Sequence, residues 1–496
     1  MPLDAAVDKV VVTHGGALRA KYGAAGLSTI RAALRTSIGR DRGRGITTAV
    51  VDLSRRAAVA PVGQQPVADP GDHERVRAVV DALCELTAPD YLLLLGGPDV
   101  VPVVPLRNPM PAPDPDPDVP SNLPYACPGS AGLDAGTLVG PTRVVGRLPD
   151  VPGASGEPAA REFAALIRRS ARWAAVAPDR HRDPFCVSTA RWQLATSATL
   201  AALRGDPPGA PAPALSAAPP AAAPWPPAEL AKPLHLVNLH GASADPSWLG
   251  DPGFAPALSS GDLPGALGAG TVVLAECCFA AELWDPALAG ALPIPLAYLA
   301  AGAYGLVGPT CISYGGRATP DVADVLVRMV GQELLAGASL GRALLTARQR
   351  YVADQPVMTP VDLKTLAQFD LLGDPSIQPV SAPVPTTRAA RRSALTAAGG
   401  RLARSTPVAV PVGAPASADT IRSARAVSGA RIGPLQTFDV VAPTPAVRAG
   451  LGEIRIHLAA RRRPGPRAAA QLQVVEFRED AAGLREHRRL ESRSRG

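Results

Sequence analysis

The chain has 496 residues, which exceeds a single small domain and predicts two or three. Apolar residues make up 47% of it and aromatic residues only 4%, so its core must consist mainly of alanine, valine and leucine. The net charge is +7. No run of about 18 apolar residues predicts a membrane span, and the first residues lack the pattern of a signal peptide.

The first part of the chain alternates between expected strands and helices. Helices are predicted over residues 17–44 and 73–88, and the strands are VDKVVVTHGG, ITTAVVDLS, DYLLLLGGPDVVP and TRVVGRLPD. This alternation is typical of parallel βαβ units. We therefore expect an N-terminal α/β subdomain over residues 1–157.

A second α/β block is expected over residues 158–380. Its strands are PFCVSTA, LHLVNLHG, TVVLAECC and GAYGLVGPT, and its helices cover 158–177, 294–303, 318–333 and 338–353. The proline- and alanine-rich stretch 205–228 cannot form a packed core and predicts a long surface loop.

The remaining residues, 381–496, indicate a linker and a low-complexity basic tail. Their arginines gather in 388–404 and 461–496. Because Phe477 is the only aromatic residue within these stretches, a solvated flexible tail is favoured over binding to nucleic acid. The alternating GEIRIHLAA and a hairpin around Asp480–Gly483 leave room for a small β module.

Two of the expected strands end in reactive residues. LHLVNLHG ends in His240-Gly241, and TVVLAECC ends in Cys277-Cys278. The carboxyl ends of neighbouring parallel strands lie side by side, where ligands collect in open α/β sheets. There an imidazole can remove the thiol proton, the thiolate can attack a carbonyl, and the amides of Gly241 and Cys277 can stabilise the oxyanion.

The order of these motifs resembles the caspase-like clan of cysteine peptidases, and their surroundings narrow the resemblance to the gingipain family. DYLLLLGGPDVVP, SNLPYA and VVGRLPD look like that family's N-terminal subdomain. LVNLHG, VVLAEC, GAYGLVGPTCISYG and FDLLGDPS look like its catalytic subdomain. The resemblance covers residues 45–380. It implies a caspase-like, three-layer sandwich around a parallel sheet, built in two subdomains.

The resemblance also implies roles for single residues. Cys277 matches the family's nucleophile and His240 its base, with Cys278 as the alternative nucleophile. Arg191 stands where the family has a glutamate that supports the histidine, so the triad is reduced to a dyad. WQLATSATLAAL lacks the family's acidic residue for a basic P1 side chain, so that specificity is not carried over. Asn122 stands where the family usually has an aspartate.

Several other residues have two interpretations. Trp248 and Trp284 follow the candidate catalytic strands and either wall the substrate cleft or cap the core. Ser313 and Tyr314 are candidates for lining the cleft, whereas Asp374 is expected to fix the backbone. The six cysteines show neither a disulfide framework nor the paired spacing of zinc ligands, which fits reduced thiols in a cytoplasm and no metal site.

Together these features predict a cytoplasmic cysteine endopeptidase that acts on peptide or protein substrates through an acyl-enzyme and needs no cofactor. The alternative is an inactive gingipain-like scaffold or binding protein, which the missing glutamate motivates. The sequence indicates neither the P1 preference nor the oligomeric state.

Overall fold

The computed structural model describes residues 7–129, 132–207, 215–218, 225–251, 253–381, 388–429, 432–464 and 470–494. Most of the loop expected over 205–228 lies outside these residues. No helix in the described ranges is both long and apolar enough to span a membrane.

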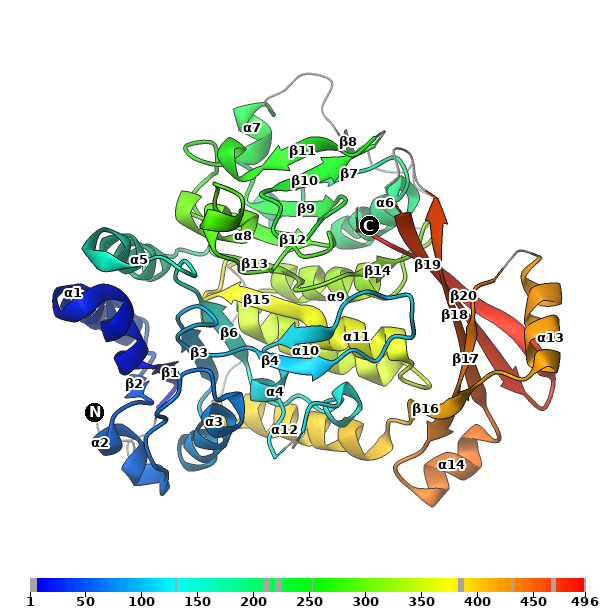
Figure 1. The fold of residues 1–496 in the computed structure, drawn as a ribbon. Coiled ribbons are helices and arrows are strands. Elements are labelled where there is room, and N and C mark those ends of the chain that lie inside the picture. Colours follow the sequence, from blue (N-terminus) through cyan, green and yellow to red (C-terminus); the bar gives the residue numbers. More distant parts are fainter. Residues whose placement is uncertain are drawn as a thin grey trace.

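The centre of the molecule is a ten-stranded sheet with helices around it (Figure 1). From one edge to the other its strands are β2 (Thr48–Asp52), β1 (Lys9–Thr13), β3 (Tyr91–Leu95), β6 (Val145–Leu148), β15 (Phe369–Gly373), β13 (Gly305–Pro309), β12 (Val272–Ala275), β9 (Leu234–Asn238), β7 (Phe185–Ser188) and β8 (Ser216–Ala217). The fold is therefore α/β with a mostly parallel sheet, as the sequence predicted.

One junction in this sheet departs from the expected parallel order. β15 pairs in parallel with β6 but antiparallel with β13, with Gly305 opposite Gly373. Each half of the sheet is parallel within itself, and the two halves run in opposite directions. The FDLLGDPS segment thus adds a strand from the expected catalytic subdomain to the sheet of the N-terminal one.

The helices form layers on both faces of the sheet. They are α1 (Gly15–Gly43), α3 (His73–Thr87), α5 (Gly156–Ser170), α6 (Gln193–Arg204), α8 (Ile294–Ala301), α9 (Ala323–Leu335), α10 (Leu340–Asp354) and α11 (Pro360–Gln368). Along β12, Val272 and Leu274 belong to the apolar cluster that includes α9, whereas Val273 and Ala275 belong to the cluster that includes α8. This alternation is what a strand covered on both faces requires.

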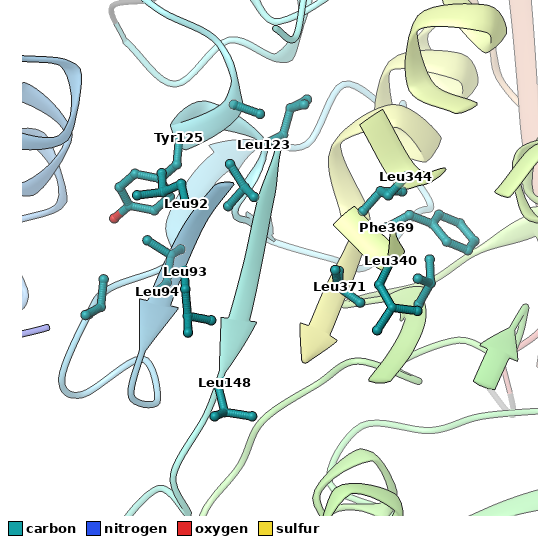
Figure 2. Close-up of a cluster of buried hydrophobic side chains, with 14 of the residues drawn as sticks. Leu92, Leu93, Leu94, Leu123, Tyr125, Leu148, Leu340, Leu344, Phe369 and Leu371 are labelled. Carbon is teal, nitrogen blue, oxygen red and sulfur yellow. The ribbon is translucent and has the colours of Figure 1, made fainter. Parts of the chain in front are cut away.

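The two halves of the sheet share one continuous core, since Leu92 of β3 and Leu274 of β12 belong to the same apolar cluster. Figure 2 shows leucines of β3, such as Leu93, on one side and Leu340 and Leu344 of α10 with Phe369 of β15 on the other. Beside them Asn122 joins the neighbouring strands β6 and β15 through polar contacts. Its Oδ1 accepts from Arg147 at 2.6 Å and its Nδ2 donates to Asp370 at 2.8 Å. An ionised aspartate at this position could not donate to Asp370, which explains why an asparagine suits it.

The chain after residue 381 is more ordered than the flexible tail favoured by the sequence. It forms α12 (Arg388–Ser405), β16 (Val408–Pro415), α13 (Ala418–Ser428), β17 (Leu435–Val441), α14 (Pro445–Leu451), β18 (Arg455–Pro464), β19 (Ala470–Asp480) and β20 (Gly483–Ser492). We call residues 408–492 the C-terminal module. Its five strands make an antiparallel sheet that continues through β20 onto β14 (Tyr314–Gly315) of the preceding part.

The expectation of a solvated tail is wrong for the C-terminal module because several of its arginines are buried in ion pairs. The guanidinium of Arg488 lies 2.8 Å from Asp362 of α11 and 2.9 Å from Glu476 of β19, and its side chain is 7% exposed. Alternate residues of the same strands are apolar, and Phe438, Ile456 and Val474 share a core cluster with Val361 of α11. The module therefore packs onto the α/β part.

Candidate active site

The candidate site lies at the edge of the sheet where β9 and β12 end. These strands pair in parallel, with Ala275 opposite Val237. His240 follows the last residue of β9 by two positions, and Cys277 follows that of β12 by two. The structure thus places the two predicted strand ends side by side.

His240 is buried, and its two ring nitrogens have different surroundings. Nε2 lies 3.0 Å from Oδ1 of Asp251, while Nδ1 has no hydrogen-bond partner among the residues that the structure describes. The ring packs between those of Trp192 and Phe254, each with its centroid 4.6 Å away. Asp251 therefore favours the tautomer with a proton on Nε2 and leaves Nδ1 able to accept one.

The protonation of this pair suits a base. Burial lowers the pKa of His240, and the hydrogen bond and charge of Asp251 oppose this shift without cancelling it. Partial burial raises the pKa of Asp251, but the hydrogen bond and charge of His240, together with hydrogen bonds from the Arg191 backbone and the Thr189 side chain, lower the pKa below its usual value. A neutral imidazole beside an ionised carboxylate is the state that proton abstraction needs.

Asp251 is a site residue that the sequence analysis did not identify. The family resemblance placed the supporting carboxylate at position 191, where this chain has an arginine. The Nε of Arg191 lies 2.6 Å from Oε2 of Glu491. Asp251 follows β10 (Ser247–Gly250), which forms a hairpin with β11 (Ala255–Ser259). The backbone of His240 pairs with that of Leu249 in β10, which brings Asp251 back to the imidazole. In the sequence, this role was indicated only by an aspartate directly after the short run SWLG.

The thiol of Cys277 contacts the backbone at the end of β9. Its sulfur accepts from the amide of Leu239 at 3.3 Å, and Cys277 belongs to an apolar cluster with Val273 and Tyr298. Burial raises the pKa of this thiol. Among the described residues, no hydrogen bond joins Cys277 to His240. The structure therefore brings the predicted nucleophile near the predicted base without a direct contact.

Cys278 has a different neighbour, the segment that follows β13. Its sulfur accepts from the amide of Ser313 at 3.1 Å, and burial raises the pKa of the thiol to about 12. Its backbone touches Gly241, where a Cβ would lie 1.8 Å from the carbonyl oxygen of Cys278. Gly241 is thus required for the close approach of these two strand ends.

The last described residues of the chain lie in the candidate site. The amide of Gly241 donates to the carbonyl oxygen of Arg493 at 2.9 Å, and the amide of Arg493 donates to that of Ser313 at 3.0 Å. Figure 1 shows the C-terminal end of the chain beside α6, which Trp192 immediately precedes. The predicted oxyanion donor thus holds a peptide carbonyl.

The side chain of Arg493 is fully buried between two carboxylates. Its Nη1 lies 3.0 Å from Oε2 of Glu276, and its Nη2 bonds to Asp324 near the start of α9. The guanidinium also lies 5.5 Å from the ring centroid of Trp192. Burial and the neighbouring Asp324 raise the pKa of Glu276 well above its usual value, although Arg493 opposes the shift. The sequence analysis assigned no role to these carboxylates.

The other predicted cleft residues have varied positions. Trp248 is buried in the core, with its ring centroid 5.9 Å from that of Tyr298, and Trp284 is also buried. Ser313 takes part through its backbone, while the hydroxyl of Tyr314 donates to Asp114 at 2.7 Å. Trp192, rather than Trp248, packs against the imidazole.

Asp374 stabilises the backbone, as expected. It accepts from the amide of Ser376 at 2.9 Å and pairs with Lys9 at 2.7 Å.

Strained backbone gathers around the site. Ala244, Phe254, Phe279 and Val322 all have positive φ, from 33° to 58°. Phe254 contacts His240, Phe279 directly follows Cys278, and Val322 directly precedes the helix that carries Asp324. Residues held in this region cost about 1–3 kcal/mol each and concentrate at functional sites.

The arrangement brings a buried imidazole, the thiol of Cys278 and a backbone donor together around one peptide group. In the parts of the chain that the structure describes, no three His, Cys, Asp or Glu side chains gather as ligands for a metal ion. No protein-family model matches the sequence, and no curated protein resembles it closely enough to count as a relative.

Proposed function

We propose that the protein is a gingipain-like cysteine endopeptidase. The observation that carries this proposal is the hydrogen bond from Gly241 to a peptide carbonyl, beside His240 and Cys278. A backbone amide aimed at a carbonyl oxygen is the donor that the oxyanion of acyl transfer requires. The resemblance of the motifs to the family supports the same activity.

Between the two thiols, the contacts favour Cys278 as the nucleophile over Cys277, which the motif alignment favoured. The sulfur of Cys278 and the backbone of Arg493 both contact Ser313, so this thiol belongs to the same surroundings as the bound peptide group. The sulfur of Cys277 instead contacts the backbone of β9 within the core. Because β12 ends at Ala275, strand alternation does not determine the direction of either side chain.

In the proposed reaction, Nδ1 of His240 takes the proton of Cys278, and the sulfur forms a bond to the carbonyl carbon. The π electrons move to the oxygen, which the Gly241 amide stabilises. The C–N bond then breaks as His240 returns the proton to the leaving amine. Water attacks the thioester, again with His240 as base, and releases the acid and the free thiol.

Cleavage of a diverse peptide library by the full-length protein tests this function. Turnover should persist in Cys277→Ala and vanish in Cys278→Ala. The opposite result would return the nucleophile to Cys277. Turnover unchanged in both variants would exclude a cysteine mechanism.

The alternative is an inactive scaffold, which the raised pKa values of both thiols favour. If the full-length protein binds peptides and cleaves none, and iodoacetamide labels neither thiol at neutral pH, the scaffold function would replace the peptidase.

A further inference from the structure

We propose that Arg191 is a positioning residue for His240 and Asp251, and that its ion pair with Glu491 lets the C-terminal module hold the base in its working orientation. The inference rests on the proposed function, because it concerns how the site of that function is assembled. In the family resemblance a glutamate at this position supports the histidine directly, whereas Arg191 acts on it through Asp251 and Trp192.

The connection from β7 to α6, residues 189–192, lies against the His240–Asp251 pair. The backbone of Arg191 donates a hydrogen bond to the carboxylate of Asp251, and the ring of Trp192 packs on the imidazole with the centroids 4.6 Å apart. Since both contacts come from neighbouring residues of one short connection, a shift of the connection would move the hydrogen-bond donor and the aromatic ring together. The position of residues 189–192 therefore determines how well the base is oriented.

The side chain of Arg191 links this connection to the C-terminal module. Its Nε lies 2.6 Å from Oε2 of Glu491 in β20. The side chains of Arg191 and Glu491 are 26% and 5% exposed, so the pair is shielded from much of the solvent screening that weakens surface ion pairs. Glu491 is fixed in turn by Gln473 of β19, whose Nε2 donates to its Oε1 at 3.4 Å. The group that anchors Arg191 is thus held by the sheet of the module.

The same strand reaches the connection at a second point. β20 ends at Ser492 and leads directly into Arg493, whose guanidinium lies 5.5 Å from the ring centroid of Trp192. Two neighbouring residues of the connection, Arg191 and Trp192, therefore contact the end of a single strand. Docking of β20 forms both contacts at once, and an undocked module would release both. The orientation of the base thus depends on the docked C-terminal module.

The charged groups that act on the imidazole allow an effect of charge to be separated from positioning. These groups, with the carboxyl groups paired to the two arginines, are Asp251, Arg191, Arg493, Glu491, Glu276 and Asp324. Burial lowers the pKa of His240, Asp251 raises it, and the positive charge of Arg191 lowers it further. By charge alone, loss of the Arg191 cation would raise this pKa, and loss of the Glu491 anion would lower it. Positioning predicts the same change for both losses, because either one breaks the ion pair.

The tautomer of His240 reports the orientation of Asp251 without requiring turnover. In full-length protein with isotope-labelled histidine rings, nitrogen chemical shifts show which ring nitrogen is protonated, and His240→Gln identifies the signals. The spectra are recorded at about pH 8, where the imidazole is neutral because its pKa lies below the usual 6.5. Asp251→Ala gives the reference for a lost carboxylate. Arg350→Met, which breaks the ion pair of α10 with Glu333 of α9, is the matched control.

We expect the parent protein and Arg350→Met to hold one tautomer, with the proton on Nε2. Arg191→Met and Glu491→Gln should both weaken this preference in the direction of Asp251→Ala, because each breaks the ion pair that holds the connection. Arg191→Lys keeps a cation for Glu491 and should retain most of the preference. Tautomer ratios in Arg191→Met and Glu491→Gln equal to that of Arg350→Met would overturn the proposal.

The kinetics and the pKa of His240 are measured on the same variants. In both Arg191→Met and Glu491→Gln, kcat for peptide cleavage should fall about 10- to 100-fold, because misplacement of a reacting group by about an ångström has an effect of this order. Opposite shifts of the His240 pKa in the two variants, with an unchanged tautomer in both, would mean that Arg191 acts by its charge alone. That result would also overturn the proposal.

The positioning role and the peptidase function can fail separately. If the two variants change the tautomer as expected but the parent protein cleaves no peptide, the function fails and the positioning of His240 by Arg191 stands. If the parent cleaves peptides and both variants keep its tautomer, the function stands and the positioning role fails. Glu491→Gln is nearly isosteric with the native residue, so it provides the test where Arg191→Met does not fold.

Discussion

The carboxylate of Asp251 lies 3.0 Å from Nε2 of His240, and within the described part of the chain the opposite ring nitrogen has no partner. In the proposed active site, this pair supplies a third member where the sequence predicted a dyad. Its carboxylate comes from the far side of a hairpin rather than from the strand β7, so the same support for the imidazole is provided from a different direction.

Replacement of Asp251 tests whether it positions the base. Asp251→Asn should lower kcat about 10- to 1,000-fold, because correct orientation and protonation of a general base contribute rate factors of this order. Removing the carboxylate also removes an influence that raises the pKa of His240, so the acidic limb of the pH–rate profile should move to lower pH. Asp354→Asn, at the exposed end of α10, is the control. An unchanged profile would argue against the role of Asp251.

Gly241 should tolerate no side chain. In Gly241→Ala the new Cβ would lie 1.8 Å from the backbone of Cys278, so the two strand ends must separate. Such overpacking costs about 1–3 kcal/mol of unfolding free energy, and the displaced amide should reduce activity severely. Gly261→Ala, where a Cβ meets nothing within 4 Å, should be close to neutral. Urea unfolding and peptide cleavage measured on both variants distinguish the two sites.

The buried His235 makes stability depend on pH. Burial lowers its pKa to about 3, whereas the unfolded chain keeps about 6.5. Between these values the unfolded state binds the extra proton, so stability is complete above pH 6.5 and is lost as the pH falls. The expected loss for this group is about 1.4 kcal/mol per pH unit. Urea unfolding at pH 7, 6 and 5 should show it, and a folded His235→Gln variant should have a slope smaller by about one proton.

Arg488 should be required for the stable docking of the C-terminal module. In Arg488→Met the buried carboxylates of Asp362 and Glu476 lose their cation, and breaking such a pair costs about 3–5 kcal/mol. Arg485→Met on the same strand has a 61% exposed side chain and should change stability by less than about 0.5 kcal/mol. Chemical denaturation followed by circular dichroism compares the two. Equal effects would mean that Arg488 does not stabilise the docking.

The sequence was sufficient for the local elements and for the two strand ends. Apolar runs such as TVVLAECC identified buried strands, and the alternation with helices identified an α/β fold. The antiparallel entry of β15 was not visible, because the direction of a strand depends on partners far along the chain. For the same reason Arg488 and Arg493 resembled parts of a solvated tail, since their carboxylate partners lie in α9, α11 and β19.

The candidate site was predicted in part. His240, Gly241 and the two cysteines follow strands, where position along the sheet can be inferred. Asp251, Asp324 and Arg493 reach the same place from a hairpin, a helix and the end of the chain. No periodicity links such residues, and only the folded chain shows that they meet.

Because of the junction between β15 and β13, strand carboxyl ends gather at two opposite ends of the sheet instead of one. Strand carboxyl ends of the N-terminal half face away from those that carry His240 and Cys277. A cavity on that other side is lined by Tyr22, Asp150 and Leu296. Insertions into the loops at one end of the sheet would leave the loops at the other end unchanged. The loops at each end can therefore vary independently while the strands between them stay the same.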